Sequence, residues 1–213
     1  ETTLGHTREL SNLEFEEKEE IQRILNQLTN DIRPFQELLL AYQTYLTHVD
    51  VTAAKAKYAS EMDALLPEIN DQKELFLREA YHPLLYMTNK LKNEKTWPQT
   101  IQLHHENRII VISGPNAGGK SITLKTIGLL QVMLQSGLLI PVHERSSVCL
   151  FDKILTDIGD NQSIENHLST YSYRLKNMNQ FLKKCNAKTL FLIDEFGTGS
   201  DPEFGGALAE AFL

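Results

Sequence analysis

A glycine-rich run in the middle of the chain has the composition of a phosphate-binding loop. Residues 114–121 read GPNAGGKS, in which Gly114, Gly119, Lys120 and Ser121 fit the spacing GxxxxGK[ST]. Glycines let main-chain N–H groups converge on phosphate oxygens without side-chain clashes, and a following helix adds the partial positive charge of its N-terminus. We expect Lys120 to neutralise the β- and γ-phosphates of ATP, and the Ser121 hydroxyl to bind the Mg²⁺ that bridges them.

The remaining residues of this loop complete the predicted nucleotide site. Asn116 can donate a hydrogen bond to the γ-phosphate, although the positions between the glycines vary in role. A glycine-rich turn between a strand and a helix without any ligand is the alternative, and the eight-residue match in this context disfavours it. The residues expected to contact ATP are Gly114, Pro115, Asn116, Ala117, Gly118, Gly119, Lys120, Ser121 and Ile122.

Two adjacent carboxylates follow another apolar run. Residues 188–193 read KTLFLI, and Asp194 and Glu195 come directly after them. Ligands of open α/β sheets bind beyond the carboxyl ends of the strands, so both acids are expected where the phosphate loop opens. Asp194 can hold Mg²⁺, and Glu195 can orient or deprotonate the attacking water. Without the phosphate loop, two acids after a strand would more often be ordinary loop residues.

Strands and helices must alternate if these two motifs are to meet. A buried strand at residues 109–112 is expected to run into the phosphate loop, and the alternation predicts an α/β sheet with much parallel pairing. Apolar runs typical of strands occupy residues 74–78, 100–103, 108–113 and 188–193, and helical patterns occupy 121–135, 165–184 and a stretch from about Pro202.

The first part of the chain has the periodicity of a long helical arm. Apolar residues recur every seven positions between residues 12 and 49, which indicates helix, and Pro34 should kink or divide it. The acidic run at residues 15–20 suits the positive end of a helix, and Asp50 or Thr52 can cap a further helix that ends before Pro67. We therefore expect a helical segment over residues 1–72 and an ATPase domain over 73–213.

The composition narrows the class of protein. Of 213 residues, 41% are hydrophobic and 23% are charged, which is typical of a globular domain and argues against disorder. No apolar run is long enough to cross a membrane, so we expect a cytoplasmic protein without a membrane partner. The net charge of −7 means that a nucleic acid would need a local basic patch to bind.

Three stretches resemble one family closely: ISGPNAGGKSITLKTIGLL, FDKILTDIGDNQSIENHLSTYSYRLKNM and LFLIDEFGTGSDPEFGGALAEA. They are similar to the ATPase domain of the MutS family, and TLKT, DIGDNQSIENHLST and GTGSDP favour its second bacterial branch, which lacks the mismatch-recognition domain. REAYHPLL resembles the start of the family's ATPase domain. We expect a structural role for His82 in this stretch, because proline follows it and no partner base is evident. The arm resembles the end of the helical lever that carries the family's clamp.

The resemblance implies an ABC-type P-loop fold in which two ATP molecules are shared between two subunits. Lys120 and Glu195 would be the catalytic residues, and the partner subunit would contribute Ser169 from LSTYS, where Tyr171 replaces the family's usual phenylalanine. The roles of Asp160, Asn161 and Gln162 stay open. The chain stops at Leu213, before the family's last strands, so the resemblance implies a fragment whose own hydrolysis is in doubt.

These features predict an ATP-driven, Mg²⁺-dependent homodimeric clamp that acts on DNA in repair or recombination, with branched or recombining DNA as the expected partner. The alternatives are a ribosome-associated quality-control ATPase of the same branch, another ABC-class ATPase in chromosome maintenance or transport, and a dimer that ATP stabilises without hydrolysis. The transporter-type run LSGGQ and long coiled-coil insertions are not seen in the sequence.

Overall fold

The computed structural model describes residues 2–115, 118–159, 170–195 and 202–212. The chain divides into two compact units, Glu1–Ala54 and Lys55–Leu213. This division differs in position from the expected functional boundary between residues 72 and 73, which stays a prediction. No helix among the described residues is long and apolar enough to span a membrane.

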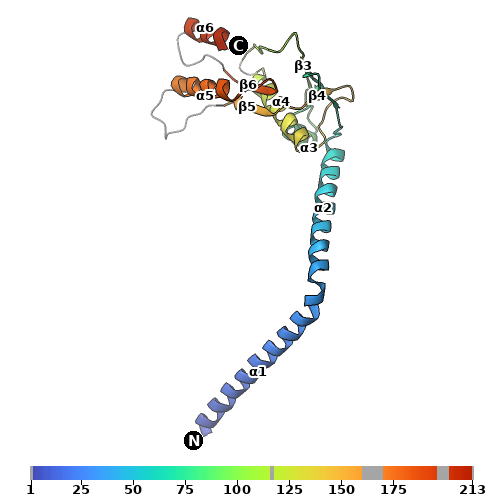
Figure 1. The fold of residues 1–213 in the computed structure, drawn as a ribbon, viewed down its shortest axis with the longest axis vertical. Helices are drawn as coiled ribbons and strands as arrows, with labels where there is room; N and C mark the ends of the chain where they lie inside the picture. The colour runs from blue at the N-terminus through green and yellow to red at the C-terminus, as the bar shows by residue number, and fades with distance from the viewer. Residues whose placement is uncertain (1, 116–117, 160–169, 196–201, 213) are drawn as a thin grey trace. The chain divides into compact units, whose positions relative to one another are not determined.

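The first unit is a helical arm that a short 3₁₀ segment divides. Helix α1 (Thr2–Ile32) leads into η1 (Arg33–Phe35) and then into α2 (Gln36–Glu61), which continues into the second unit. The chain changes direction at η1 (Figure 1). Pro34 lies inside η1, and because proline cannot donate the helical hydrogen bond, the predicted division of the arm at this residue is confirmed.

Two expectations about the arm are wrong. The acidic run at residues 15–20 lies within α1 and not at its start, because the helix already begins at Thr2. Asp50 and Thr52 lie inside α2 and cap no new helix, and the Thr52 hydroxyl donates to the His48 carbonyl oxygen one turn earlier, at 2.8 Å. The alanines and lysines that follow are good helix formers, so the helix continues through this point to Glu61.

The second unit begins with a four-stranded mixed sheet. Its order is β1-β4-β2-β3, with β1 and β4 parallel and the other neighbours antiparallel. Helix α3 (Pro83–Lys92) connects β2 to β3. The strands are β1 (Glu68–Asn70), β2 (Leu75–Ala80), β3 (Gln99–Leu103) and β4 (Ser147–Cys149).

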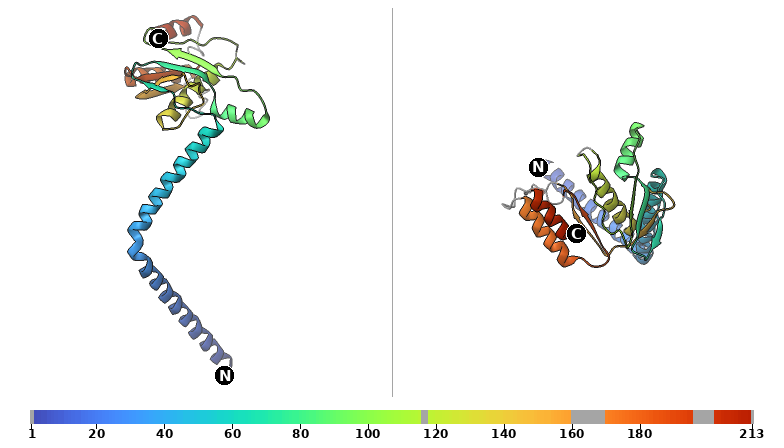
Figure 2. Two further views of the ribbon diagram at one scale, coloured as in Figure 1. Left: turned by 90° about the vertical axis from the view of Figure 1, so that its right-hand side faces the viewer. Right: turned by 90° about the horizontal axis from the view of Figure 1, so that it is seen from above.

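A second sheet holds the candidate carboxylates. Strands β5 (Lys153–Asp157) and β6 (Thr189–Ile193) pair in parallel. Neighbouring residues of a strand point to opposite faces, and Leu192 lies against helix α4 whereas Phe191 contacts rings of α5 and α6. Figure 2 shows α4 (Lys120–Gln135) on one side of these strands and α5 (Thr170–Lys184) with α6 (Pro202–Phe212) on the other.

One hydrophobic core joins the two sheets through α4. This helix buries Ile127, Leu130 and Leu134 between them, as the predicted apolar face requires. The other buried members of the core are Leu75, Leu77, Ala80, Ile140, Val142, Val148, Leu190 and Leu192.

The expected buried strand at residues 109–112 is wrong. The structure assigns no regular secondary structure there, and Ile109, Ile110 and Val111 are 51%, 44% and 77% exposed. A strand requires a neighbour that satisfies its main-chain groups, and none of the described strands pairs with this segment. The chain is a mixed helix and sheet protein with an N-terminal helical arm, and its ABC-type P-loop class remains a prediction.

Candidate functional site

The described part of the glycine-rich loop has the backbone that its sequence requires. Gly114 has a positive φ of +148°. Gly119, the N-cap of α4, has φ +81°, a left-handed conformation that glycine adopts without steric cost. Gly118 donates its N–H to the Pro115 carbonyl oxygen at 2.9 Å. A Cβ at Gly118 would lie 3.0 Å from that same oxygen, so this turn favours glycine.

Lys120 is the first residue of α4, and its side chain folds back over the loop. Its Nζ donates to the carbonyl oxygens of Gly114 and Pro115, the latter at 2.9 Å. The ammonium group therefore stands at the mouth of the loop, close to main-chain positions that a phosphate would also approach. Ser121 and Ile122 follow in the first helical turn and are half-buried.

Helix α4 runs antiparallel to β5 and β6. Near its end, the Gln135 side-chain amide and the main chain of Phe151 exchange two hydrogen bonds of 3.0 and 2.9 Å, just before β5 begins. In its middle, Gly128 lies against Leu192 of β6. The first turn of α4, with Lys120, must therefore lie toward the end at which β5 and β6 finish.

Three carboxylates follow or end these two strands. The Asp194 N–H donates to the Asp157 carbonyl oxygen at 2.9 Å, so the two acids are adjacent across the parallel pair. Asp157 is only 4% exposed, and its Oδ2 has no hydrogen-bond partner among the described residues. Asp194 is half-buried, and Glu195 is exposed with φ +52°. Water therefore has access to the Glu195 carboxylate.

A guanidinium group from α5 reaches Glu195. Arg174 Nη1 donates to the Glu195 carbonyl oxygen at 2.6 Å, and its Nη2 lies 3.9 Å from Glu195 Oε2. Neither Arg174 nor Asp157 was expected from the sequence. The sequence does hold a signal for Asp157, because this acid comes two residues after the apolar pair Ile154 and Leu155. The contact of Arg174 with Glu195 has no such signal, since it arises only when α5 packs on the sheet.

The surroundings of His82, which include Lys125 of α4, shift its pKa. His82 is the N-cap of α3, and its Nδ1 is buried without a hydrogen bond among the described residues. Burial lowers the pKa of His82, and the positive charge of Lys125 on α4 lowers it further. A neutral imidazole that begins a helix is consistent with the structural role that its sequence context predicts.

Several predicted site residues lie outside the described residues: Asn116, Ala117, Asp160, Asn161, Gln162 and Ser169. The structure thus brings Lys120 and Ser121 toward the same end of the second sheet as Asp194 and Glu195. No group of three potential metal ligands from His, Cys, Asp and Glu occurs in the part of the chain that the structure describes.

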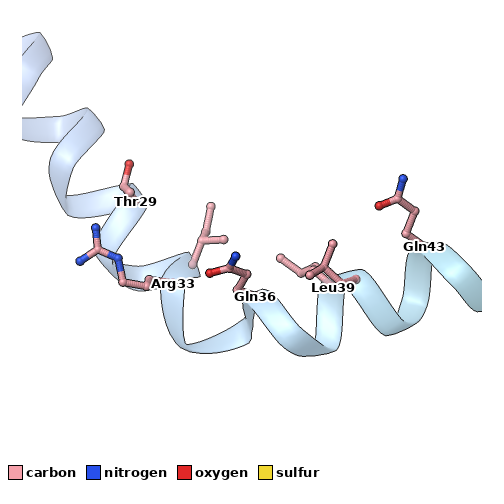
Figure 3. A pocket seen from close by; sticks show the side chains of 7 residues that line it. Thr29, Arg33, Gln36, Leu39 and Gln43 are labelled. Carbon is pink, nitrogen blue, oxygen red and sulfur yellow. The ribbon is translucent and has the colours of Figure 1, made fainter.

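A shallow groove of about 410 Å³ lies at the bend of the arm (Figure 3). Arg33 is its one charged residue, and no acid faces it from the lining. The rest of its lining consists of two side-chain amides, one hydroxyl and three aliphatic side chains. The lining residues are Thr29, Ile32, Arg33, Gln36, Leu39, Leu40 and Gln43.

Known proteins resemble the chain in both units. Residues 110–213 match the sequence model of MutS domain V. The chain is 47% identical to Endonuclease MutS2 of Lactiplantibacillus plantarum over 197 residues, 92% of this chain and 24% of that protein. It is 45% identical to Endonuclease MutS2 of Finegoldia magna over 96% of this chain and 25% of the relative.

A third relative aligns along the whole chain. Endonuclease MutS2 of Pediococcus pentosaceus is 43% identical over all 213 residues, which are 26% of its length. The chain thus spans about a quarter of the length of the curated relatives it matches. The chain is therefore similar to MutS domain V over residues 110–213 and to one part of the Endonuclease MutS2 proteins over nearly all of its own length.

Proposed function

We propose that residues 73–213 form an ABC-type domain that binds and hydrolyses ATP. The observation that carries this proposal is the convergence of two motifs at one end of the second sheet. Helix α4 directs its first turn, with the glycine loop and Lys120, toward the end at which Asp194 and Glu195 follow β6. A cationic loop and carboxylates at the same end of a sheet are what Mg²⁺-dependent phosphoryl transfer requires.

The residues present fit a triphosphate and its metal ion. The loop turns without a side chain at Gly118, and its two positive-φ glycines leave room for close main-chain approach. Lys120 would neutralise phosphate charge, and Ser121 and Asp194 would hold Mg²⁺. When bound, the metal supplies charge neutralisation on the phosphates. Glu195, exposed to solvent, would orient or deprotonate the attacking water.

The proposed active form is a homodimer that shares its nucleotides. Ser169 of one subunit would contact the ATP held by the glycine loop of the other, so that two ATP molecules join the domains. We propose that this closure moves the helical arms on DNA, as in a clamp. The printed names of the relatives describe endonucleases, which favours a nucleic acid, and branched or recombining DNA in repair is our leading candidate.

ATP turnover by the full-length protein tests the catalytic part. The wild-type protein should hydrolyse ATP in the presence of Mg²⁺, and Glu195→Gln should bind ATP but lose at least about tenfold in kcat, because an amide cannot accept the proton. If neither the wild-type protein nor Glu195→Gln hydrolyses ATP above the uncatalysed background and the protein yet dimerises with ATP, the chain is an ATP-stabilised dimer without hydrolysis.

Footprinting tests the partner. The full-length protein should protect branched DNA more strongly than linear duplex, and ATP should change the pattern if nucleotide moves the arms. Equal protection of both DNAs would contradict a preference for branched structures. Protection of ribosomal RNA in intact ribosomes, without protection of DNA, would instead favour the quality-control role of the same branch.

A further inference from the structure

Arg174 holds two parts of Glu195 at once. Its guanidinium donates to the Glu195 carbonyl oxygen at 2.6 Å and lies 3.9 Å from the carboxylate. The Arg174 side chain is 11% exposed, whereas that of Glu195 is 57% exposed. The guanidinium is thus fixed within the protein, and the carboxylate remains open to water. A planar, always charged group with several donors can make both contacts, which a single ammonium cannot do in this geometry.

The backbone of Glu195 needs such support. Its φ of +52° is in the left-handed region, where the Cβ of a non-glycine residue crowds the carbonyl oxygen. Residues of this kind persist when surrounding contacts determine their conformation, and they cluster at functional sites. A charge-assisted hydrogen bond to the carbonyl of that same residue is a direct way to hold it.

Helix α5 provides a rigid base for this contact. Arg174, Met178 and Phe181 are spaced four and three residues apart, so they share one helical face. Met178 is buried, and the Phe181 ring lies 6.0 Å from that of Phe191 on β6. That face therefore packs on the second sheet, beside which α5 lies in Figure 1. The Arg174 guanidinium reaches Glu195, two residues after the end of β6. Lys176 is exposed and lies off this face.

We infer that Arg174 is a positioning residue that fixes the main chain of Glu195 and so directs its carboxylate for catalysis. This inference rests on the proposed ATPase function of Glu195. It also connects two regions, because α5 begins at Thr170, the residue after Ser169. The Arg174 guanidinium thus links the main chain of Glu195, the proposed general base, to the helix that begins directly after Ser169, the proposed contact with the other subunit.

Steady-state ATPase kinetics of the full-length protein test this role. Arg174→Ala should lower kcat by about tenfold to a hundredfold, since small displacements of a reacting group cost that much, and leave KM for ATP within about threefold. Arg174→Gln keeps an amide donor but no charge, so its kcat should lie between those of Arg174→Ala and the wild-type protein. Lys176→Ala, on the same helix but exposed, should match the wild-type protein.

A double variant separates positioning from general support of the fold. Adding Arg174→Ala to Glu195→Gln should leave the residual rate unchanged, because Arg174 acts through the carboxylate that is already lost. A further drop in that rate, or a raised KM with unchanged kcat, would overturn the inference. Melting temperatures of all variants should agree with the wild-type value, and a loss of kcat accompanied by a large fall in melting temperature would instead show a structural role.

The same data distinguish the inference from the proposed function. If wild-type protein hydrolyses ATP, Glu195→Gln does not, and Arg174→Ala retains full kcat, only the positioning role of Arg174 is wrong. If the wild-type protein and Glu195→Gln hydrolyse ATP at the same rate, the proposed catalytic role of Glu195 fails, and the role of Arg174 fails with it.

Discussion

At the scale of single residues, Lys120 tests the phosphate loop most directly. Lys120→Ala should weaken ATP binding by about 2 to 4 kcal/mol, because it removes a charge paired with phosphate. Titration of the full-length protein with a fluorescent ATP analogue measures this change. Lys125→Ala, an exposed lysine of the same helix, is the matched control and should bind ATP as the wild-type protein does. Unchanged affinity in Lys120→Ala would remove this residue from the site.

His82 should make the stability of the protein sensitive to acid. Burial and Lys125 lower the pKa of His82 below its ordinary value of 6.5. The unfolded chain therefore binds more protons than the folded chain in mildly acidic solution, and the free energy of unfolding falls as the pH drops through about 6.5 toward the folded pKa. Above this window, both states are neutral at His82, and its contribution no longer changes.

The His82→Gln variant isolates this effect. Urea unfolding at a series of pH values from about 7.5 to about 5 should show a smaller loss of stability in the variant than in the wild-type protein. The other titratable groups contribute equally to both proteins. Parallel curves for the two proteins would rule out His82 as a source of the acid sensitivity.

The roles of single residues could be predicted from the sequence where all residues of a motif lie in one short stretch. Gly114, Gly119 and Lys120 were found from spacing alone, and the structure gives the two glycines the positive φ angles that the loop needs. Arg174 could not be found in this way, because its contact with Glu195 joins residues 21 positions apart and depends on how α5 packs.

At the scale of elements, the packing of α4 on β6 offers a sharp test. An alanine Cβ at Gly128 would lie 2.7 Å from Leu192 Cδ1, closer than any real contact, so the helix or the leucine must move. We expect Gly128→Ala to destabilise the fold by about 1 to 3 kcal/mol in urea unfolding. Because Leu192 can change rotamer, the lower part of this range applies if the helix stays in place.

Gly206→Ala in α6 is the matched control for this prediction. Both glycines lie inside helices, but no described heavy atom lies within 4 Å of a Cβ at Gly206. Alanine is the better helix former, so this variant should gain about 0.5 to 1 kcal/mol. Equal effects of the two substitutions would mean that the close approach of α4 and β6 does not limit this position.

Elements with a strong local signal agree with the structure, and elements that depend on distant partners do not. Helix α4 and strands β2, β3 and β6 follow their apolar patterns, and Pro34 marks η1. Strands β1 and β4 have three residues each, too few to show a period. The apolar run at 109–112 reads as a strand, but strand formation needs a pairing neighbour that local sequence cannot supply.

At the scale of the whole molecule, the shared nucleotide site is the main prediction. Ser169→Arg in the full-length protein should leave ATP binding by a single subunit intact, because the glycine loop belongs to the other side of the interface. It should block the hydrolysis that depends on dimerisation, since a bulky cation would occupy the contact with the partner's nucleotide. Sedimentation with ATP, together with turnover, measures both effects. Wild-type turnover by this variant would refute the shared site.

The division of the arm at η1 has a mechanical consequence. Helix α1 has 31 residues, which corresponds to a rod of about 46 Å. Rotation by only ~10° about a three-residue segment at its end would sweep the opposite tip through about 8 Å. Small changes of the backbone dihedral angles beside Pro34 can thus displace the far tip of α1 by nearly a nanometre. The helices on either side of η1 keep their internal hydrogen bonds during such a movement.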